Sequence, residues 1–596
     1  MSLSRRDALK LGIFGGAAMA LPMTRLVRAK STTTNRLASS QLPTPYTRRF
    51  RPIAPATPAL SKQDPVTGDW VDLYELHMRP TNVDLLGNGL LTPMFAYNGQ
   101  VPGPTVRARQ GRRTVLRHCN DLPSTHPTLS YKTWTSVHLH GSAALPQYDG
   151  YASDITNPSS YKNYRYPNSQ TARTLWYHDH GVHHTAENVY SGLAAQYHLI
   201  DGSEQVLDLP QNNYDVEMIV SDVMFNNDGS LLFSLDNEAG MWGDVIMVNG
   251  TPWPFMEVEP RKYRFHFLAA SVSRSYQFSL STGGPMWVIG SDGGYAQYAQ
   301  KVTSWRQGMA ERYEVVIDFA AYAGKTIQLR NTSPKKNTDY VNVDKVIEFR
   351  VGTSVTSTAG NMSYLDSAAA RAVPAGAYST AIPIAKALPA AQFPKSNSVM
   401  DLRETDAVNY GQAPRRLALV REHGQWTVNG TTWQDIIDSN FTKTLGNPRQ
   451  GTTEIWELAN DSGGWFHPLH IHLVDFKILS RNGKAPANYE MAPKDVVYLG
   501  PNESVKVVMK FDGLGRYMVH CHNLVHEDHD MMTQFAVVRD PSLPVDDPQN
   551  NTMFWDDEFA APYRGTWWAG PRQISIDPVR SDPAQPEPTP LPPLDF

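Results

Sequence analysis

One cysteine stands between two histidines near the C-terminal end of the chain, at His520, Cys521 and His522. His526 follows five residues after the cysteine, and Met531 follows ten residues after it. Successive side chains of a strand point to opposite faces, so a strand here would turn Cys521 to one side and both flanking histidines to the other. Cysteine, histidine and a weak axial methionine are the ligands of a blue-copper site. We therefore predict that this strand contacts two metal centres.

Three more histidine pairs have the same spacing, with one residue between the two members. They are His138 and His140, His178 and His180, and His470 and His472. On a strand, each pair directs both imidazoles to one face. A single such pair is more often exposed or hydrogen-bonded than a metal site, but four pairs in one chain indicate metal binding. Neutral imidazole suits copper and zinc. One zinc ion takes about four ligands and would leave most of these histidines unexplained.

The composition is typical of an all-β protein. A hydrophobic content of 41% is enough for several cores, and 44 prolines and 41 glycines suit short strands joined by turns. At roughly 150 residues per domain, a chain of this length is expected to form about three or four domains. The net charge of −4, with both signs interspersed, provides no basic region for nucleic acid.

Strand rhythm and the placement of the histidine motifs predict three consecutive β-domains. Their predicted bounds are 66–205, 206–355 and 396–570. The segments between and around them are an arm rich in Ser, Thr and Pro at 31–65, a linker at 356–395 and a tail at 571–596. Apolar runs predict strands at 115–119, 135–141, 216–220 and 264–268. The histidine motifs fall only in the first and third domains, so we expect the metal centres there.

The first thirty residues resemble a twin-arginine export signal. Arg5 and Arg6 precede an apolar run from Leu11 to Pro22, which is too short to span a bilayer. The residues around Ala29 are typical of a cleavage site. A disordered basic tail is the alternative interpretation. We expect an exported protein, periplasmic or extracellular, with no membrane span.

The chain contains two cysteines. If Cys521 binds a metal, Cys119 has no disulfide partner. Cys119 falls in the predicted strand at 115–119, so we expect a buried free thiol.

Eight stretches resemble a known family. The four histidine motifs are VHLHG at 137–141, WYHDHG at 176–181, HPLHIH at 467–472 and HCH at 520–522. They resemble the copper signatures of the multicopper oxidases. The stretches at 172–177, 258–265, 309–316 and 473–477 are similar to bilirubin oxidases and spore-coat-type bacterial laccases within that family. The resemblance runs from about residue 65 to 560. It implies an all-β fold of three consecutive cupredoxin-like Greek-key β-barrel or sandwich domains.

The resemblance also implies four copper ions, one of type 1, one of type 2 and a type 3 pair. The residues that match the type 1 ligands are His467, Cys521, His526 and Met531. Those that match the type 2 ligands are His138 and His470. Those that match the type 3 ligands are His140, His178, His180, His472, His520 and His522. Met532 is an alternative axial ligand that the ten-residue spacing disfavours, and His183, His184 and His529 are expected not to bind metal.

The implied reaction oxidises phenols, aromatic amines or tetrapyrroles such as bilirubin and reduces dioxygen to water. Electrons would pass through Cys521, and Asp149 and Glu527 match acids that assist proton delivery. An Asp-Gly turn and a solvated loop carboxylate are their structural alternatives. Trp465 matches a tryptophan beside the type 1 site. We expect a monomer that takes dioxygen and a small reducing substrate.

Two other functions remain open. A metallo-oxidase acting on Cu(I) or Fe(II) often carries a methionine-rich segment, whereas the 20 methionines here are scattered. A partner-binding protein that has lost catalysis should lack several ligands, and none is missing. Ligating histidines also need a partner for the second ring nitrogen. The acidic neighbours that qualify are Asp179, Asp475, Glu527 and Asp528, and the sequence does not choose among them.

Overall fold

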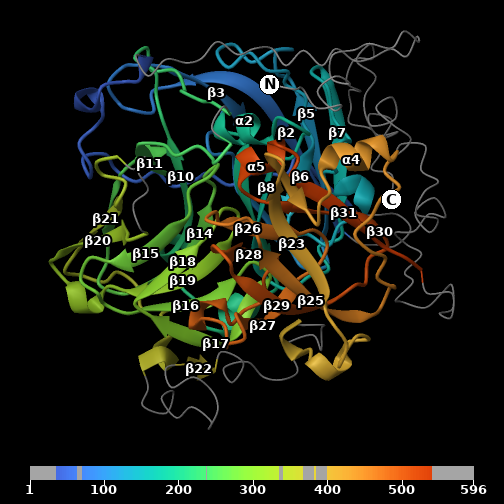
Figure 1. Cartoon of the computed structure of the whole chain (residues 1–596). Coiled ribbons are helices and arrows are strands. Elements are labelled where there is room, and N and C mark those ends of the chain that lie inside the picture. The colour runs from blue at the N-terminus through green and yellow to red at the C-terminus, as the bar shows by residue number, and fades with distance from the viewer. Residues whose placement is uncertain are drawn as a thin grey trace. The chain divides into compact units, whose positions relative to one another are not determined.

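The computed structural model describes residues 35–63, 70–235, 238–333, 340–366, 381–383 and 399–539. The predicted export signal at 1–30 and the tail at 571–596 lie outside the described residues, as does most of the linker at 356–395. The described residues from Leu37 onward belong to one compact unit. They form six β-sheets with few helices, so the predicted all-β fold is confirmed (Figure 1).

The first two sheets use strands from the N-terminal third of the chain. One sheet contains β1 (Leu60–Gln63), β2 (Trp70–Val83), β3 (Thr92–Tyr97), β5 (Arg113–Asn120) and β7 (Ser160–Tyr166). The other runs in the order β4 (Val106–Arg109), β9 (Ala194–Ile200), β8 (Arg173–Asp179) and β6 (Val137–His140). The pairs β2–β5 and β4–β9 are parallel, which requires crossover connections, and the others are antiparallel.

The next two sheets use the middle of the chain. The eight-stranded sheet runs β12 (Thr251–Pro252), β11 (Val245–Val248), β10 (Asp215–Val223), β14 (Lys262–Ala269), β19 (Arg312–Asp318), β16 (Met286–Ser291), β17 (Gly294–Val302) and β22 (Ala381–Pro383). Its five-stranded partner runs β13 (Phe255–Val258), β21 (Lys345–Val351), β20 (Thr326–Asn331), β15 (Tyr276–Leu280) and β18 (Ser304–Gln307). We call these two sheets the middle sheet pair, the two sheets described before them the first sheet pair, and the two sheets described next the last sheet pair.

The last two sheets use the C-terminal part of the described chain. One runs β24 (Gln425–Val428), β23 (Arg415–Glu422), β25 (Thr453–Asn460), β29 (Ser504–Lys510) and β27 (Phe476–Arg481). The other runs β28 (Val496–Leu499), β26 (His467–Ile471), β30 (Gly515–Cys521) and β31 (Met532–Val537). The α-helices are short: α2 (Thr185–Tyr190), α3 (Ser203–Val206), α4 (Trp433–Asp438) and α5 (Leu524–Asp528).

Burial patterns explain where these strands form. In β4, Val106 and Ala108 are buried and Arg107 and Arg109 are exposed, which is the alternation of a sheet with one solvent face. Every residue of β6, β26 and β30 is buried, so these strands lie between other layers of the protein. The four predicted strands lie in or overlap β5, β6, β10 and β14. The domain boundaries stay predictions, although β1 lies within the predicted arm and β22 within the predicted linker.

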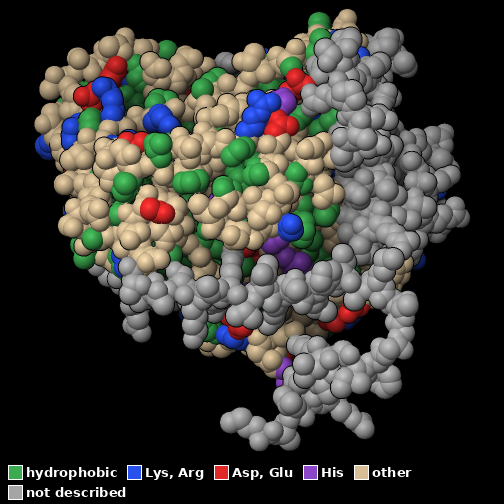
Figure 2. All heavy atoms as spheres, turned by 90° about the horizontal axis from the view of Figure 1, so that it is seen from above, with side chains coloured by type: hydrophobic (Ala, Val, Ile, Leu, Met, Phe, Trp, Pro, Cys, Tyr) green, Lys and Arg blue, Asp and Glu red, His purple; other side chains and the backbone are tan. Residues whose placement is uncertain are grey.

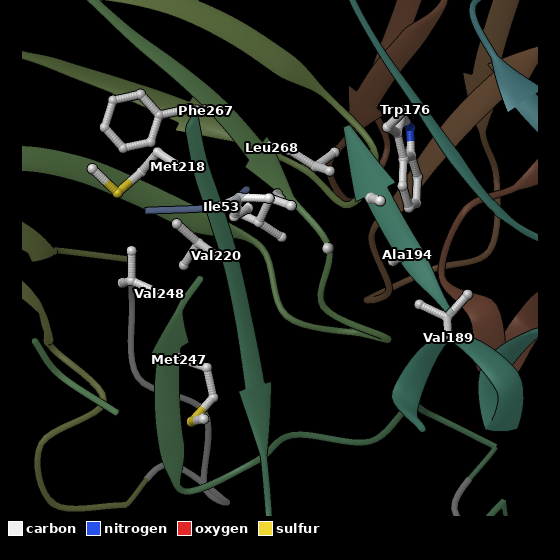
Figure 3. Close-up of a cluster of buried hydrophobic side chains, with 14 of the residues drawn as sticks. Ile53, Trp176, Val189, Ala194, Met218, Val220, Met247, Val248, Phe267 and Leu268 are labelled. Atoms are coloured by element: carbon white, nitrogen blue, oxygen red, sulfur yellow. The ribbon is translucent and has the colours of Figure 1, made fainter. Parts of the chain in front are cut away.

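One hydrophobic core spans the first sheet pair and the middle sheet pair. Figure 3 shows Leu268 pointing toward Trp176 and Ala194, whereas Phe267, the preceding residue of β14, lies on the other side with Met218. A separate core fills the last sheet pair and includes Cys521. On the face in Figure 2, described acidic and basic side chains are interspersed without a patch of one sign. Among the described residues, no helix is long and apolar enough to cross a membrane.

Candidate metal centres

Two antiparallel strand pairs carry the four histidine motifs. In the first sheet pair, β6 lies beside β8, and His138 is opposite His178. In the last sheet pair, β26 lies beside β30, and His470 is opposite His520. All eight paired histidines are buried. Each strand pair therefore presents its imidazoles together, as the spacing predicted.

The eight imidazoles gather into three groups, in each of which the potential ligand atoms lie within 4.8 Å of one another. The groups are His138, His470 and His472; His140, His178 and His522; and His180, His472 and His520. Every group combines residues of the first and last sheet pairs. The sequence predicted this set of histidines but not its division into triads.

The tautomers of two histidines show why a cation fits between them. Nδ1 of His138 donates to the carbonyl oxygen of Asp149 at 2.5 Å, and Nδ1 of His470 donates to that of Asp495 at 2.8 Å. In a neutral ring, Nε2 is then an acceptor. These two Nε2 atoms face each other 3.4 Å apart. Two facing lone pairs repel, and a metal ion between them would turn this repulsion into coordination.

Glu527 lies beside the Nδ1 atoms of two other histidines. Its carboxylate lies 2.9 Å from Nδ1 of His520 and 3.6 Å from Nδ1 of His180. Burial raises the pKa of Glu527, but electrostatic and hydrogen-bond interactions with the neighbouring His520 and His180 rings outweigh burial and lower the pKa to about 2. Glu527 is thus an acceptor at neutral pH. The Nε2 atoms of His180 and His520 face each other at 3.1 Å, so this pair also suits a cation.

Several ring nitrogens are buried without a hydrogen-bond partner among the described residues: Nδ1 of His140, Nε2 of His178 and both nitrogens of His522. A buried polar atom left unsatisfied costs about 1–3 kcal/mol. Burial lowers the pKa of all three rings well below the usual value, so they are neutral. Neutral, unpaired imidazole is the form that coordinates copper. The donor set of this triad therefore fits a metal ion.

A fourth group forms around Cys521. Its Sγ lies 3.3 Å from Nδ1 of His467 and 3.6 Å from Nδ1 of His526, and the two Nδ1 atoms are 3.0 Å apart. Burial raises the pKa of the Cys521 thiol, although the backbone N–H of Asn523 opposes this. A thiolate here requires a bound cation. Nε2 of His467 lies 2.8 Å from Ser462 Oγ and donates or accepts a hydrogen bond there, depending on the tautomer of the ring.

The two candidate axial methionines lie in different cores. Met531 is buried in the hydrophobic core that contains Cys521, and its carbonyl oxygen accepts the backbone N–H of Cys521 at 3.1 Å. Met532 packs in another core with Trp433 and Met518. This placement favours Met531, as the spacing did.

The strand alternation predicted at residues 520–522 is present. Cys521 belongs to the group with His467 and His526, whereas His520 and His522 belong to two separate histidine triads. One strand end therefore contacts three groups. Cys119 is buried and forms no disulfide, as expected.

Asp149 contacts two of the triads. Its Oδ2 lies 2.7 Å from Nδ1 of His472, and its backbone carbonyl accepts from His138. Burial raises the pKa of Asp149, although the electrostatic interaction and hydrogen bond with the His138 ring partly lower it. Asp149 and Glu527 are both buried beside histidines. The alternative interpretation of Glu527 as a solvated carboxylate on a loop is therefore wrong.

Of the four acids considered as histidine partners, the carboxylate of Glu527 contacts the triads. Asp475 pairs with Arg173 at 2.7 Å, and Asp528 accepts two backbone N–H groups at the start of α2. The Asp179 carboxylate accepts from the backbone of Ser136, while its carbonyl accepts from Nδ1 of His178. His183, His184 and His529 belong to none of the groups.

Sequence reasoning missed two residues at the centres. Asp495 lies 3.0 Å from Nε2 of His140, and no local motif marks it. Trp426 stacks on His526 with ring centroids 4.2 Å apart, and it meets Trp465 edge to face with ring centroids 5.6 Å apart. Neither residue lies near a histidine motif in the sequence, so only the folded structure identifies them.

Comparisons with known proteins agree with this geometry. Three family models described as multicopper oxidase match residues 78–200, 176–341 and 413–541. The bilirubin oxidase of Albifimbria verrucaria is 39% identical over 542 residues, covering 88% of this chain and 85% of that protein. The laccase of Bacillus subtilis (strain 168) is 32% identical over 514 residues, covering 77% and 93%.

A solved structure gives the fold. The McoA multicopper oxidase from the hyperthermophile Aquifex aeolicus matches with a TM-score of 0.67 and 24% identity, covering 83% of this chain and all of that one (100%). This likeness confirms the predicted fold class, an all-β arrangement of cupredoxin-like domains.

Proposed function

Since the chain belongs to the multicopper oxidase family, whose members are oxygen-using oxidoreductases with type 1, 2 and 3 copper, we propose which residues hold each ion. The type 1 ligands are His467, Cys521, His526 and Met531. The type 2 ligands are His138 and His470. The type 3 ligands are the triads His140, His178 and His522, and His180, His472 and His520. The main support is that imidazole Nε2 atoms of different strands face each other at 3.1–3.4 Å inside the protein.

The reaction couples one-electron oxidation of a reducing substrate to four-electron reduction of dioxygen to water. Bound copper supplies the electron-transfer steps and the place where dioxygen reacts. The chain supplies the connection, because peptide bonds join Cys521 to a histidine of each type 3 triad. The twelve proposed ligands all belong to this one chain, so the proposed sites need no residue of a second subunit, and we propose a monomeric enzyme.

Asp149 and Glu527 are proposed to assist proton delivery. Each is buried and lies within 3.0 Å of a ring nitrogen of a proposed ligand, His472 and His520 respectively. Carboxylates in such contact orient the rings and hold protons beside the site where water forms.

The reducing substrate is proposed to dock beside Trp426. Arg421 lies over the ring of Trp426 at 4.7 Å and of Trp465 at 5.8 Å, and it pairs with Glu238. The Arg421 side chain is 29% exposed and Glu238 is 48% exposed, whereas Trp426 is buried. Aromatic faces and a guanidinium suit an aromatic donor that carries acidic groups. We propose that phenols, aromatic amines and tetrapyrroles such as bilirubin bind beside these residues.

Oxygen-uptake kinetics test the assignment. The copper-loaded protein would be assayed side by side with bilirubin, a phenol, Fe(II) and Cu(I). We expect the aromatic donors to have the higher kcat/KM. A large preference for Fe(II) or Cu(I) would favour the metallo-oxidase alternative, and copper binding without oxygen uptake would indicate a storage protein.

We also propose export through the twin-arginine segment, to the periplasm or the exterior. The support is the sequence around Arg5 and Arg6 followed by a short apolar run. Replacing both arginines with lysine should retain the protein in the cytoplasm, as measured by cell fractionation. Unchanged export of that variant would refute the proposal.

A further inference from the structure

The middle sheet pair carries none of the proposed copper ligands, yet one of its side chains reaches the histidines. Arg312 begins β19 and is fully buried. Its guanidinium forms a two-pronged ion pair with Asp495 of the last sheet pair. Nη1 donates to Oδ1 at 2.7 Å and Nη2 donates to Oδ2 at 2.5 Å. Two parallel bonds fix direction as well as distance.

The remaining N–H groups of Arg312 are also used. Nε donates to the carbonyl oxygen of Thr174 at 3.0 Å, Nη1 to that of Ala310 at 3.0 Å, and Nη2 to that of Asp292 at 3.1 Å. All five guanidinium donors are therefore satisfied, two by Asp495 and three by backbone. The charge is held in one orientation by three separate segments of the chain.

Asp495 carries this constraint to the histidines. Its Oδ1 accepts from Nε2 of His140 at 3.0 Å, and its carbonyl oxygen accepts from Nδ1 of His470 at 2.8 Å. The rings of His140 and His470 stack with centroids 3.7 Å apart. A single aspartate thus sets the tautomer of one proposed type 3 ligand and one proposed type 2 ligand.

Asp292 of the middle sheet pair fixes the backbone on both sides of this ion pair. Its Oδ1 accepts the backbone N–H of Arg312 at 2.7 Å, and its Oδ2 accepts that of Asp495 at 3.2 Å. Lys494 adds an ion pair to the same oxygen at 3.0 Å. The Arg312–Asp495 pair is therefore anchored at main chain and side chain.

The histidine motif itself leaves room for the pair. Gly141 follows His140 with φ +88°, and a Cβ there would lie 2.7 Å from both Arg312 Nη2 and Asp495 Oδ2. Any larger residue would push against the ion pair. Because Gly141 has no side chain, it leaves the space that Arg312 of the middle sheet pair occupies beside the histidine motif.

We propose that Arg312 is a positioning residue for the oxygen-reducing site. It acts through Asp495, holding His140 and His470 in the orientation that copper coordination requires. The middle sheet pair would then have a direct part in the chemistry of a site to which it gives no ligand. This inference rests on the proposed copper assignment.

The test compares Arg312→Lys with a matched control, Arg264→Lys. Lysine keeps the positive charge but loses the two-pronged donor. Arg264 is also buried in the middle sheet pair and pairs with Glu314 at 2.5 Å, away from the proposed ligands. Copper content, blue absorption, the type 2 electron paramagnetic resonance spectrum, Tm and oxygen turnover would be measured for both variants and the unmodified holoenzyme.

We expect R312K to keep the blue absorption while its type 2 spectrum changes. Oxygen turnover should fall about 10-fold to 100-fold, the usual cost of losing an outer partner of a metal ligand, with an unchanged KM for the reducing substrate. R264K should lower only Tm. If R312K alters Tm alone, as the control does, Arg312 is merely structural and the inference fails.

A second variant covers the case in which R312K does not fold. Asp495→Asn keeps the side-chain shape and weakens the pair from the other side, so it should change the type 2 spectrum in the same way. An unchanged spectrum in a folded D495N protein would overturn the inference. If the unmodified protein itself took up no copper, the proposed function would fail instead, which separates the two results.

Discussion

The Cys521 group and the histidine triads are built in opposite ways. Cys521 meets His467 and His526, which lie 54 and 5 positions away in the sequence, inside the core of the last sheet pair. The triads join residues 332 or 340 positions apart, such as His180 and His520, from two sheet pairs. The second ring nitrogens of the first group lie beside Ser462 Oγ and the carbonyl oxygen of Ala239, whereas Asp149, Glu527 and Asp495 contact the second group. The proposed ligands of the Cys521 group therefore all come from the C-terminal part of the described chain, but the triads combine two sheet pairs and have carboxylates that fix tautomers.

Replacing Cys521 with serine separates the two regions most strongly. We expect the blue absorption to disappear while the triads still bind copper, because their contacts do not include Sγ. Oxidation should fall by more than about 100-fold, since losing only an outer partner of a ligand costs 10-fold to 100-fold. Absorption spectra, copper content and oxygen uptake measure this. Normal turnover in this variant would mean that electrons do not pass through Cys521.

Replacing Asp149 with asparagine should have the converse result. The blue absorption should persist, and oxygen reduction should slow by about 100-fold, within the range for a lost general acid. Asp154→Asn is the control, because Asp154 is buried nearby and pairs with Lys162 at 2.5 Å. That control should lower Tm and leave oxygen reduction unchanged. Unchanged oxygen turnover in fully loaded D149N protein would remove Asp149 from proton delivery.

The sequence predicted the part of these sites that is local. A histidine pair two residues apart on a strand presents both rings to one face whatever the rest of the fold does, so the eight paired histidines and the opposite orientation of Cys521 followed from spacing. The assignment of ligands to each type of copper came from the family resemblance. The pairing of His140 with Asp495, 355 positions away, depends on how β-domains dock. For the same reason, the sequence left Glu527 as one of four acids that could be partners of a ligating histidine, and the structure places it beside His520.

The sequence pattern did not predict every strand of the fold. Strand β1 lies in a segment rich in Ser, Thr and Pro, where no apolar alternation marks it, and it forms because it pairs in antiparallel register with β2. Strands β10 and β14 were predicted because their runs are apolar and buried. Edge strands gain their order from a neighbour more than from their own residues.

Replacing Trp426 with phenylalanine should affect the Cys521 side alone, and less strongly. The smaller ring loses part of the stacking on His526, so we expect a shifted blue absorption and a fall in substrate oxidation of less than about 10-fold. The type 2 spectrum should not change. Trp456→Phe is the control, since Trp456 is buried in the same core against Phe511 and Phe535. Equal shifts in both variants would show a general packing effect.

Replacing Arg421 with glutamine should produce the smallest effect, on substrate choice. A partly exposed ion pair contributes about 0.2–1 kcal/mol, so the KM for an acidic aromatic donor such as bilirubin should rise by up to about fivefold. The KM for a neutral phenol should stay unchanged. Glu238→Gln should lower the KM for the acidic donor, because it frees the guanidinium from its partner. Arg416→Gln is the control, since Arg416 lies on the same strand and pairs instead with Asp461 at 2.8 Å. Equal changes in R421Q and R416Q would show that net charge, and not docking beside Trp426, governs the preference.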